Sequence, residues 1–214
     1  MNTITPITSI SESILKYFKK GNELTTSEEF GELQIKNSAK GLEVIKEQGN
    51  DLMSFVQSYR TFLSVPEPDR ELIPATKILE KVRLLLQEYT NAHDITLEVI
   101  AEPKDLELYI DEKQLTQILL NLGKNAQQAL EGQEEGKIVI TAGESPQGKK
   151  YITVTDNGPG ISPEMLDEVF VPFFTTKSTG TGIGLSLSKQ IMRLHGGSIR
   201  VTSNETTTFT LTFQ

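Results

Sequence analysis

Two asparagines, Asn121 and Asn125, lie four residues apart in the segment 115–126. This spacing places both amides on one face of a predicted helix, with the apolar residues of the segment on the opposite side. An amide oxygen is a neutral, hard ligand that suits Mg²⁺ bound to phosphates. Taken alone, the pair is also typical of exposed polar residues on an amphipathic helix, so both interpretations stay open at this point.

A carboxylate and two glycines follow a predicted strand in the segment Asp156-Asn-Gly-Pro-Gly-Ile161. A carboxylate at the end of a buried strand is costly unless it is paired, and Asp156 has the acceptor that the exocyclic amine of adenine requires. Gly158 and Gly160 allow backbone to approach a ligand closely. The same string also suits a simple turn between strands, and these residues alone do not separate the two interpretations.

A third group of residues is the glycine-rich segment Gly180-Thr-Gly-Ile-Gly-Leu185, which opens a predicted helix that ends at Leu194. The free amides and positive dipole end of such a helix form an anion site. The segment is neither a Walker loop nor a dinucleotide fingerprint, because no Gly-Lys-Ser/Thr follows and no strand precedes it.

Between these groups lies Phe170-Val-Pro-Phe-Phe-Thr-Thr-Lys177. The adjacent phenylalanines at 173 and 174 could anchor a flap in an apolar pocket, and Lys177 could then reach a phosphate as a point charge. The alternative is a loop pinned by its aromatic side chains, with a solvated lysine.

The elements that must position these residues are predicted from periodicity. The helices are expected at 76–89, 112–130 and 183–194, and the strands at 95–101, 106–110, 137–142, 150–155, 198–203 and 207–213. Because many strands neighbour each other in sequence, the predicted fold class is α+β, with a mixed sheet and helices on one face. Residues 156–180 have little periodicity and are predicted to be mostly loop.

Residues 1–63 predict two helices separated by Gly21-Asn22. The second has a narrow apolar stripe that includes Ile35, Leu42, Val56 and Leu63, and a single hairpin offers it too little partner surface. We therefore expect an antiparallel hairpin that forms a homodimeric four-helix bundle. A hairpin that packs on its own C-terminal region is the alternative. The two prolines within 64–70 predict the domain boundary.

The composition of the chain excludes several kinds of protein and site. The formal net charge of −8 argues against a nucleic-acid binder. The absence of cysteine excludes disulfides and thiolate metal sites, and is compatible with the cytoplasm. No apolar run is long enough to cross a membrane and the first residues do not resemble a signal peptide, so we expect no membrane contact by this segment. The cytoplasmic part of a membrane-anchored sensor would also fit.

Four ordered segments resemble the N, G1, F and G2 boxes of the histidine-kinase ATPase family, which also includes Hsp90 chaperones, type II topoisomerase ATPase domains and MutL proteins. They are 111–126, 156–161, 170–177 and 180–185. The Phe-Phe-Thr-Thr-Lys string and Gln127-Gln128-Ala129-Leu130 look like the nitrogen-regulation type of sensor kinase. The resemblance implies a Bergerat fold, in which ATP lies between the sheet and a lid formed by residues 156–180.

The resemblance also implies roles for individual residues. It makes Asn125 the Mg²⁺ ligand, places Asn121 beside the phosphates and makes Asp156 the adenine acceptor. Asn121, Asn125 and Lys177 are the expected catalytic residues. The expected nucleotide-binding residues are Asn121, Asn125, Asp156, Gly158, Gly160, Ile161, Phe174, Lys177, Gly180, Thr181, Gly182, Ile183, Gly184, Leu185 and Thr207. Thr207 is the weaker assignment, because Thr206 replaces a usual glycine.

By resemblance, residues 1–65 form the dimerisation and phosphotransfer hairpin and 71–214 the ATP-binding catalytic domain. The expected function is transfer of the ATP γ-phosphate to a histidine and onward to an aspartate of a response-regulator receiver domain. Residues 1–7 resemble the end of the phosphoacceptor segment of such kinases, and this resemblance implies that the histidine lies just before Met1. The chain has only His93 and His195, neither on the first predicted helix, so we expect that it does not phosphorylate itself. Asn2 is the candidate for orienting a phosphatase water. The alternatives are a nucleotide-gated dimeric scaffold and an ATPase of the Hsp90 or MutL sort.

Overall fold

The computed structural model describes residues 4–20, 23–24, 31–177 and 180–213. The chain divides into two compact units, Met1–Leu63 and Ser64–Gln214. Among the described residues, no helix is both long enough and apolar enough to cross a lipid bilayer.

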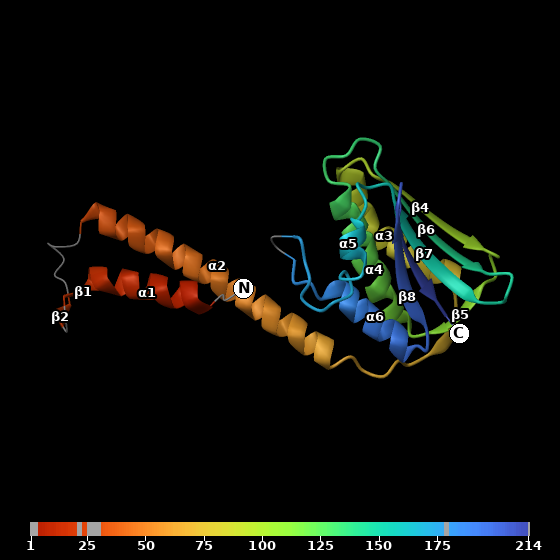
Figure 1. The fold of residues 1–214 in the computed structure, drawn as a ribbon, viewed down its shortest axis with the longest axis horizontal. Coiled ribbons are helices and arrows are strands. Elements are labelled where there is room, and N and C mark those ends of the chain that lie inside the picture. The colour runs from red at the N-terminus through yellow and green to blue at the C-terminus, as the bar shows by residue number, and fades with distance from the viewer. Residues whose placement is uncertain (1–3, 21–22, 25–30, 178–179, 214) are drawn as a thin grey trace. The chain divides into compact units, whose positions relative to one another are not determined.

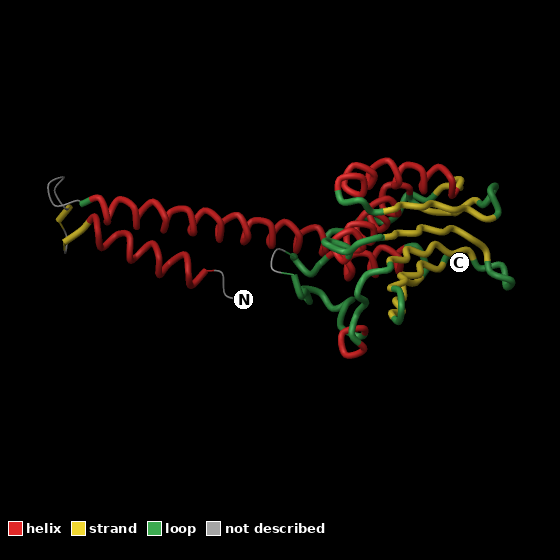
Figure 2. Tube along the Cα trace, turned by 90° about the horizontal axis from the view of Figure 1, so that it is seen from above, coloured by secondary structure: helices red, strands yellow, loops and turns green. Residues whose placement is uncertain are grey.

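The N-terminal unit has the two helices that the periodicity predicts, α1 (Ile4–Phe18) and α2 (Glu32–Leu63), with the short strands β1 (Lys19–Lys20) and β2 (Glu23–Leu24) after α1. Figure 2 shows α1 and α2 side by side. Gly41 permits this contact, because a Cβ at that position would lie 2.7 Å from Ile14 Cδ1.

The apolar stripe of α2 remains largely uncovered within this unit. Large apolar side chains along the helix are exposed: Leu33, Ile35, Leu42, Met53, Phe55, Val56, Tyr59 and Leu63. Ile14 of α1 and Ser38 of α2, by contrast, are buried. The hairpin therefore covers part of α2 and leaves a long apolar surface facing solvent.

The C-terminal unit is built on a five-stranded sheet with the order β4-β6-β7-β9-β8. Its strands are β4 (Thr96–Glu102), β6 (Lys137–Glu144), β7 (Lys150–Asp156), β8 (Ser198–Ser203) and β9 (Thr207–Thr212). β4 and β6 are parallel and the other pairs are antiparallel. Figure 1 shows the main helices of this unit on one side of the sheet. The predicted α+β class with a mixed sheet is therefore confirmed.

Three helices cover the sheet, α3 (Ala75–Ala92), α4 (Glu112–Ala129) and α6 (Gly184–Leu194). Their apolar faces meet the inward residues of the strands, which alternate with outward ones as a half-covered sheet requires. The largest fully buried side chains include Ile78, Leu86, Leu115, Ile118, Leu122, Ile138 and Ile140. The core thus fixes α4 against α6 and β7, and α6 against β8, and these elements with β9 and the loop before α6 carry the candidate residues.

Besides β1 and β2, two short elements are absent from the sequence prediction. β3 (Glu71–Pro74) pairs antiparallel with β5 (Glu107–Ile110), and α5 (Pro163–Leu166) is a single turn within the predicted loop. Pairing across more than thirty residues leaves no local periodic signal in four residues, so β3 could not be found from sequence alone.

The segment before β3 is bonded to the C-terminal unit. The backbone N–H of Asp69 donates to Asp111 Oδ2 at 3.1 Å, and Gln114 Nε2 donates to Pro66 O at 2.9 Å. The Arg70 guanidinium donates to Leu194 O at the end of α6, at 2.7 Å. Residues 66–70 are therefore attached to both helices that carry the candidate site.

Candidate functional site

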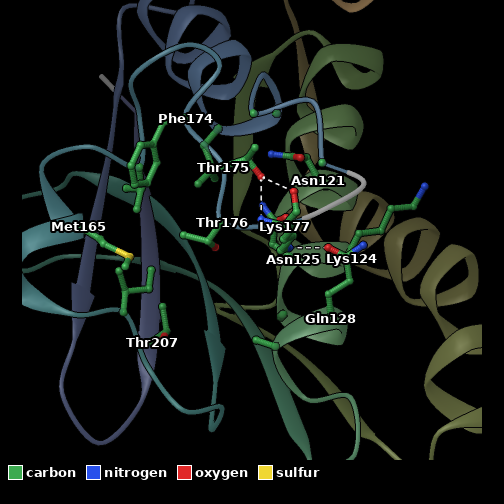
Figure 3. Close-up of a pocket in the computed structure, with 18 of the residues that line it drawn as sticks. Asn121, Lys124, Asn125, Gln128, Met165, Phe174, Thr175, Thr176, Lys177 and Thr207 are labelled. Atoms are coloured by element: carbon green, nitrogen blue, oxygen red, sulfur yellow. Dashed lines mark hydrogen bonds between the residues drawn. The ribbon is translucent and has the colours of Figure 1, made fainter. Parts of the chain in front are cut away.

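One cavity of about 630 Å³ brings most of the predicted site residues together. α4, the loop between β7 and α6, and β9 supply its walls (Figure 3). The predicted residues that line it are Asn121, Asn125, Asp156, Gly160, Ile161, Phe174, Lys177, Gly180, Thr181, Gly182, Gly184, Leu185 and Thr207. This volume lies within the usual range for small-molecule sites.

Two predicted residues do not line the cavity. Ile183 is 3% exposed and belongs to the core. Gly158 lies behind Asp156, where a Cβ would be 2.8 Å from Asp156 Oδ1 and 3.3 Å from Ala129 Cβ. Both residues therefore shape the wall rather than face its interior. Asn2 falls outside the described residues.

The asparagine face of α4 is positioned by a cap at the start of the helix. Asp111 is the N-cap residue, and its carboxylate accepts from the backbone N–H groups of Lys113 and Gln114 at 2.9 and 3.0 Å. Apolar packing on the opposite face then fixes the helix rotation, so that Asn121 and Asn125 reach the cavity.

Asn121 connects α4 to α6. Its side-chain Nδ2 donates to Ser188 Oγ at 3.1 Å, and Ser188 Oγ donates to Gly184 O at 2.9 Å. A Cβ at Gly184 would lie only 2.1 Å from Asn121 Oδ1. A larger residue at this position would therefore displace the Asn121 side chain from the first turn of α6.

Asp156 ends β7 with its side chain buried, and the residue is 4% exposed. It lies opposite Thr207 in the register between β7 and β9. The backbone N–H of Gly158 donates to Asp156 Oδ1 at 3.0 Å. Burial raises the pKa of this carboxyl, and the Gly158 hydrogen bond opposes that shift. Asp156 is thus a desolvated acceptor with room for a further donor.

The loop after Asp156 is held by two residues that the sequence analysis did not single out. Ser203 Oγ on β8 accepts from the backbone N–H of Ile161 at 2.8 Å. Asn157 Oδ1 accepts from the backbone N–H of Lys137 at 2.6 Å, and its Nδ2 donates to Glu135 O at 3.0 Å. Gly160 has φ +85°, which favours glycine at this turn.

The lid contacts the glycine-rich loop through backbone. The Phe173 N–H donates to Gly182 O at 2.9 Å. Gly182 has φ +67°, and a Cβ there would lie 2.5 Å from the carbonyl carbon of Phe173. Gly182 is required on both grounds.

Only one of the two adjacent phenylalanines lines the cavity. Phe174 does so, whereas Phe173 is 40% exposed. Phe170 packs edge-on against Phe209 of β9 and accepts a cation–π contact from Lys189 of α6, 5.3 Å from the ring centroid. The lid is therefore anchored mainly through Phe170 and Phe174.

Lys177 reaches back from the lid to α4 (Figure 3). Its ammonium donates to Asn125 Oδ1 at 3.2 Å and to Gln128 Oε1. Burial lowers the pKa of Lys177. Among the described residues, no group of three or more His, Cys, Asp and Glu side chains could hold a metal ion. Asn125 offers a cation one neutral oxygen, which fits an ion carried mainly by the phosphates of a nucleotide.

Neither histidine belongs to this cavity. The backbone N–H of Asp111 donates to His195 Nε2 at 3.0 Å, so Nδ1 carries the proton and donates to Ile191 O at 2.9 Å. His93 stacks on Tyr89 with ring centroids 4.0 Å apart. His195 is thus a structural residue that joins the end of α6 to the start of α4.

Comparison with known proteins gives the class of this unit. Residues 110–214 match the family described as histidine kinase-, DNA gyrase B- and HSP90-like ATPases. The catalytic domain of histidine kinase ThkA superposes with a TM-score of 0.62 at 31% identity, covering 68% of this chain and 95% of that one. ThkA in complex with response regulator TrrA gives a TM-score of 0.69 at 24% identity, which shows the fold alone.

Two curated relatives are also sensor kinases. Sensor histidine kinase ZraS of Escherichia coli K12 is 46% identical over 138 residues, covering 64% of this chain and 29% of ZraS. Sensory histidine kinase/phosphatase NtrB of Vibrio alginolyticus is 40% identical over 145 residues, covering 63% of this chain and 41% of NtrB. The chain belongs to the histidine-kinase ATPase family, and the resemblance to sensor histidine kinases is confirmed. It spans less than half the length of these relatives.

Proposed function

We propose that Ser64–Gln214 binds Mg²⁺·ATP and supplies its γ-phosphate to a histidine, as the catalytic core of a sensor histidine kinase. The observation that carries this is the convergence of Asn125, Asp156 and the glycine-led start of α6 on one cavity. Because these three groups suit a metal-bound phosphate, an adenine amine and an anion respectively, a purine nucleotide matches the whole cavity.

Each end of the nucleotide would meet different residues of this chain. Asp156 would accept from the adenine amine beside Thr207, while the N-terminal amides of α6 and the Lys177 ammonium would face the phosphates. Asn125 would hold the magnesium, whose charge neutralises the phosphates during in-line transfer. The apolar wall that includes Met165, Val169 and Phe209 would exclude water from the base.

The acceptor we propose is a histidine, with onward transfer to an aspartate of a response-regulator receiver domain. The names of ZraS, NtrB and ThkA support the kinase assignment, and the ThkA–TrrA complex shows a kinase of this fold engaging a regulator. An ATPase of the Hsp90 or MutL sort needs a carboxylate base at position 121. Asn121 has none, and its amide is bonded to Ser188, so we favour the kinase.

We further propose that the N-terminal unit forms a homodimer. The exposed apolar side chains of α2 run along its length from Leu33 to Leu63. A second hairpin would cover this surface as in a four-helix bundle.

Titration calorimetry with ADP and ATP tests the nucleotide proposal. We expect Asp156→Ala to weaken adenine nucleotide affinity by about 10- to 100-fold, because the charged acceptor is lost. GTP should bind poorly, since its 6-oxo group offers Asp156 no donor. Asp105→Ala, in an exposed loop, is the matched control. Equal affinity of the Asp156→Ala variant and the native chain would remove Asp156 from the base site.

A histidine-bearing dimerisation domain from a related kinase, supplied as a second polypeptide, tests the transfer step. Incubation with γ-labelled ATP and Mg²⁺ should give acid-labile label on that domain. If ATP binds and no label appears on it or on this chain, the protein is a nucleotide-gated scaffold rather than a kinase.

A further inference from the structure

Two amide oxygens of α4 converge on one ammonium group. Asn125 and Gln128 are three residues apart and therefore share a helix face, and Lys177 donates to both side chains. Lys177 comes from the lid, 49 residues beyond Gln128 in sequence, so this contact ties the lid to the helix. Figure 3 shows the three side chains, all of which line the cavity, converging on one another.

The contact uses the oxygen that the proposed function assigns to magnesium. Asn125 Oδ1 accepts from Lys177 Nζ at 3.2 Å. An ammonium group and a metal ion both bind to a lone pair of an amide oxygen. Because both are positively charged, they would repel each other if both were bound at Asn125 Oδ1. Lys177 must leave Asn125 before a metal ion can bind there. Gln128, on the other hand, can keep its bond to the lysine.

We propose that, before nucleotide binds, the Lys177 ammonium occupies the cation position of Asn125, and that Gln128 is the positioning residue that holds the lysine at this site. This proposal rests on the proposed Mg²⁺·ATP site. When Mg²⁺·ATP enters, Asn125 exchanges the ammonium for the metal. Lys177 stays tethered to Gln128, close to the phosphates.

We call the hydrogen bonds of Lys177 to Asn125 and Gln128 the latch. The backbone hydrogen bonds around Lys177 show whether the latch is closed. The Phe173 N–H donates to Gly182 O at 2.9 Å, the Phe174 N–H to Val171 O at 3.2 Å, and the Lys177 N–H to Thr175 Oγ1 at 3.1 Å. If the latch holds the lid, losing it should increase opening of these bonds. Amide hydrogen exchange measures that opening directly.

The first experiment compares hydrogen exchange of the nucleotide-free native chain with Gln128→Met, Lys177→Met and the double variant. We expect each single variant to raise exchange at 173–177 by about 5- to 10-fold, and the double variant to add little to the effect of Lys177→Met, because both single variants remove the Lys177–Gln128 bond. Gln117→Met is the matched control, since Gln117 is exposed on the same helix and does not line the cavity. Unchanged exchange in both single variants would overturn the latch.

The second experiment measures magnesium competition in the presence of ADP. Lys177→Met should weaken ADP binding without Mg²⁺ but tighten the apparent Mg²⁺ affinity of the ADP complex by about 3-fold or more, because the competing cation is gone. If Lys177 had only a structural role, Lys177→Met would weaken both ADP binding and Mg²⁺ binding. Lys124→Met, which removes a positive charge from the same cavity wall, controls for general electrostatics and should tighten Mg²⁺ binding less.

The two experiments separate the latch from the proposed function. If the native chain binds no ADP while Gln128→Met still raises hydrogen exchange at 173–177, the proposed function is wrong and the latch is supported. If ADP binds but Lys177→Met leaves Mg²⁺ affinity equal to that of Lys124→Met, the exchange of cations is wrong.

Discussion

Asn121 and Ser188 are hydrogen bonded at 3.1 Å, and this bond joins the helix that carries both site asparagines to the helix that begins at Gly184. Ser188 also donates to Gly184 O at 2.9 Å, so a single hydroxyl ties the Asn121 amide to the first turn of α6. The relative placement of Asn121 and the start of α6, to which we assign the phosphates, therefore depends on a serine outside the four motif segments.

Replacing Ser188 by alanine should weaken nucleotide binding. Asn121 would lose its partner and its freed amide could turn away from α6, at a cost of about 1 kcal/mol or roughly 5-fold in affinity. Titration calorimetry with ADP measures the change. Ser186→Ala is the matched control, because Ser186 Oγ bonds only within its own turn, to Ile183 O at 2.9 Å. Equal losses in both variants would deny Ser188 a special role.

Asp156→Asn should stabilise the nucleotide-free protein at neutral pH. Burial raises the pKa of Asp156 above its ordinary value of 3.8, so the folded state favours the protonated form. The contribution of Asp156 to the stability of the folded state is then fully present below pH 3.8 and is lost as pH rises through the raised pKa. In thermal unfolding from pH 4 to 7, the melting temperature of Asp156→Asn should rise relative to that of the native chain as pH increases. A constant difference would mean that burial does not penalise the charge.

Glu112 should stabilise the contact between α3 and α4. It accepts from Lys77 at 2.7 Å and from Lys81 at 2.8 Å, and these bonds lower its pKa from 4.5 to about 2. Its contribution is present above pH 4.5 and is lost as pH falls through about 2. Both lysines are exposed, so solvent screening limits the effect of Glu112→Gln to about 1 kcal/mol or less.

Denaturant unfolding of Glu112→Gln at pH 7 and near pH 2 tests this. The destabilisation should be present at pH 7 and should shrink near pH 2. Glu98→Gln removes the more exposed pair with Lys137 and should cost less at pH 7. A Glu112 effect that does not depend on pH would point to packing rather than charge.

Neither histidine of the chain should accept phosphate. Both ring nitrogens of His195 are engaged in a buried site, and His93 lies outside the cavity, stacked on Tyr89. Transfer needs a free imidazole nitrogen in line with the γ-phosphate. After incubation with γ-labelled ATP and Mg²⁺, we expect no acid-labile label on this chain. Label that disappears in His93→Ala would contradict this prediction.

The full chain should be a dimer, and residues 64–214 alone should be a monomer. Covering the apolar side chains of α2 would supply the association energy. Light scattering across a concentration series measures the mass of each. Leu42→Glu should weaken the dimer, whereas Lys40→Glu should not, because Lys40 is exposed and lies two residues from Leu42, on another face of α2. A monomeric full chain would overturn the bundle.

Much of the fold could be predicted from the sequence, because apolar residues recur at helical or strand spacing within its helices and strands. α4 and α6 begin within one residue of the predicted helix starts, and the strands from β6 onward fall within two residues of the alternating segments. The resemblance of four ordered segments, 111–126, 156–161, 170–177 and 180–185, to the boxes of the histidine-kinase ATPase family suggested a nucleotide site. Residue type, spacing and chain order are local properties, and they determined these features.

Tertiary structure decided how those residues are held. β3 gains its pairing from β5, and Ser188, Ser203 and Gln128 gain their roles from partners tens of residues away. It also placed Ile183 in the core, turned Phe173 to solvent, and directed Lys177 to Asn125. A hydrogen bond depends on where two atoms meet in space, and that distance is set by the packing of whole elements. A serine or glutamine on a helix face therefore has the same local pattern whether it is solvated or holds a site together.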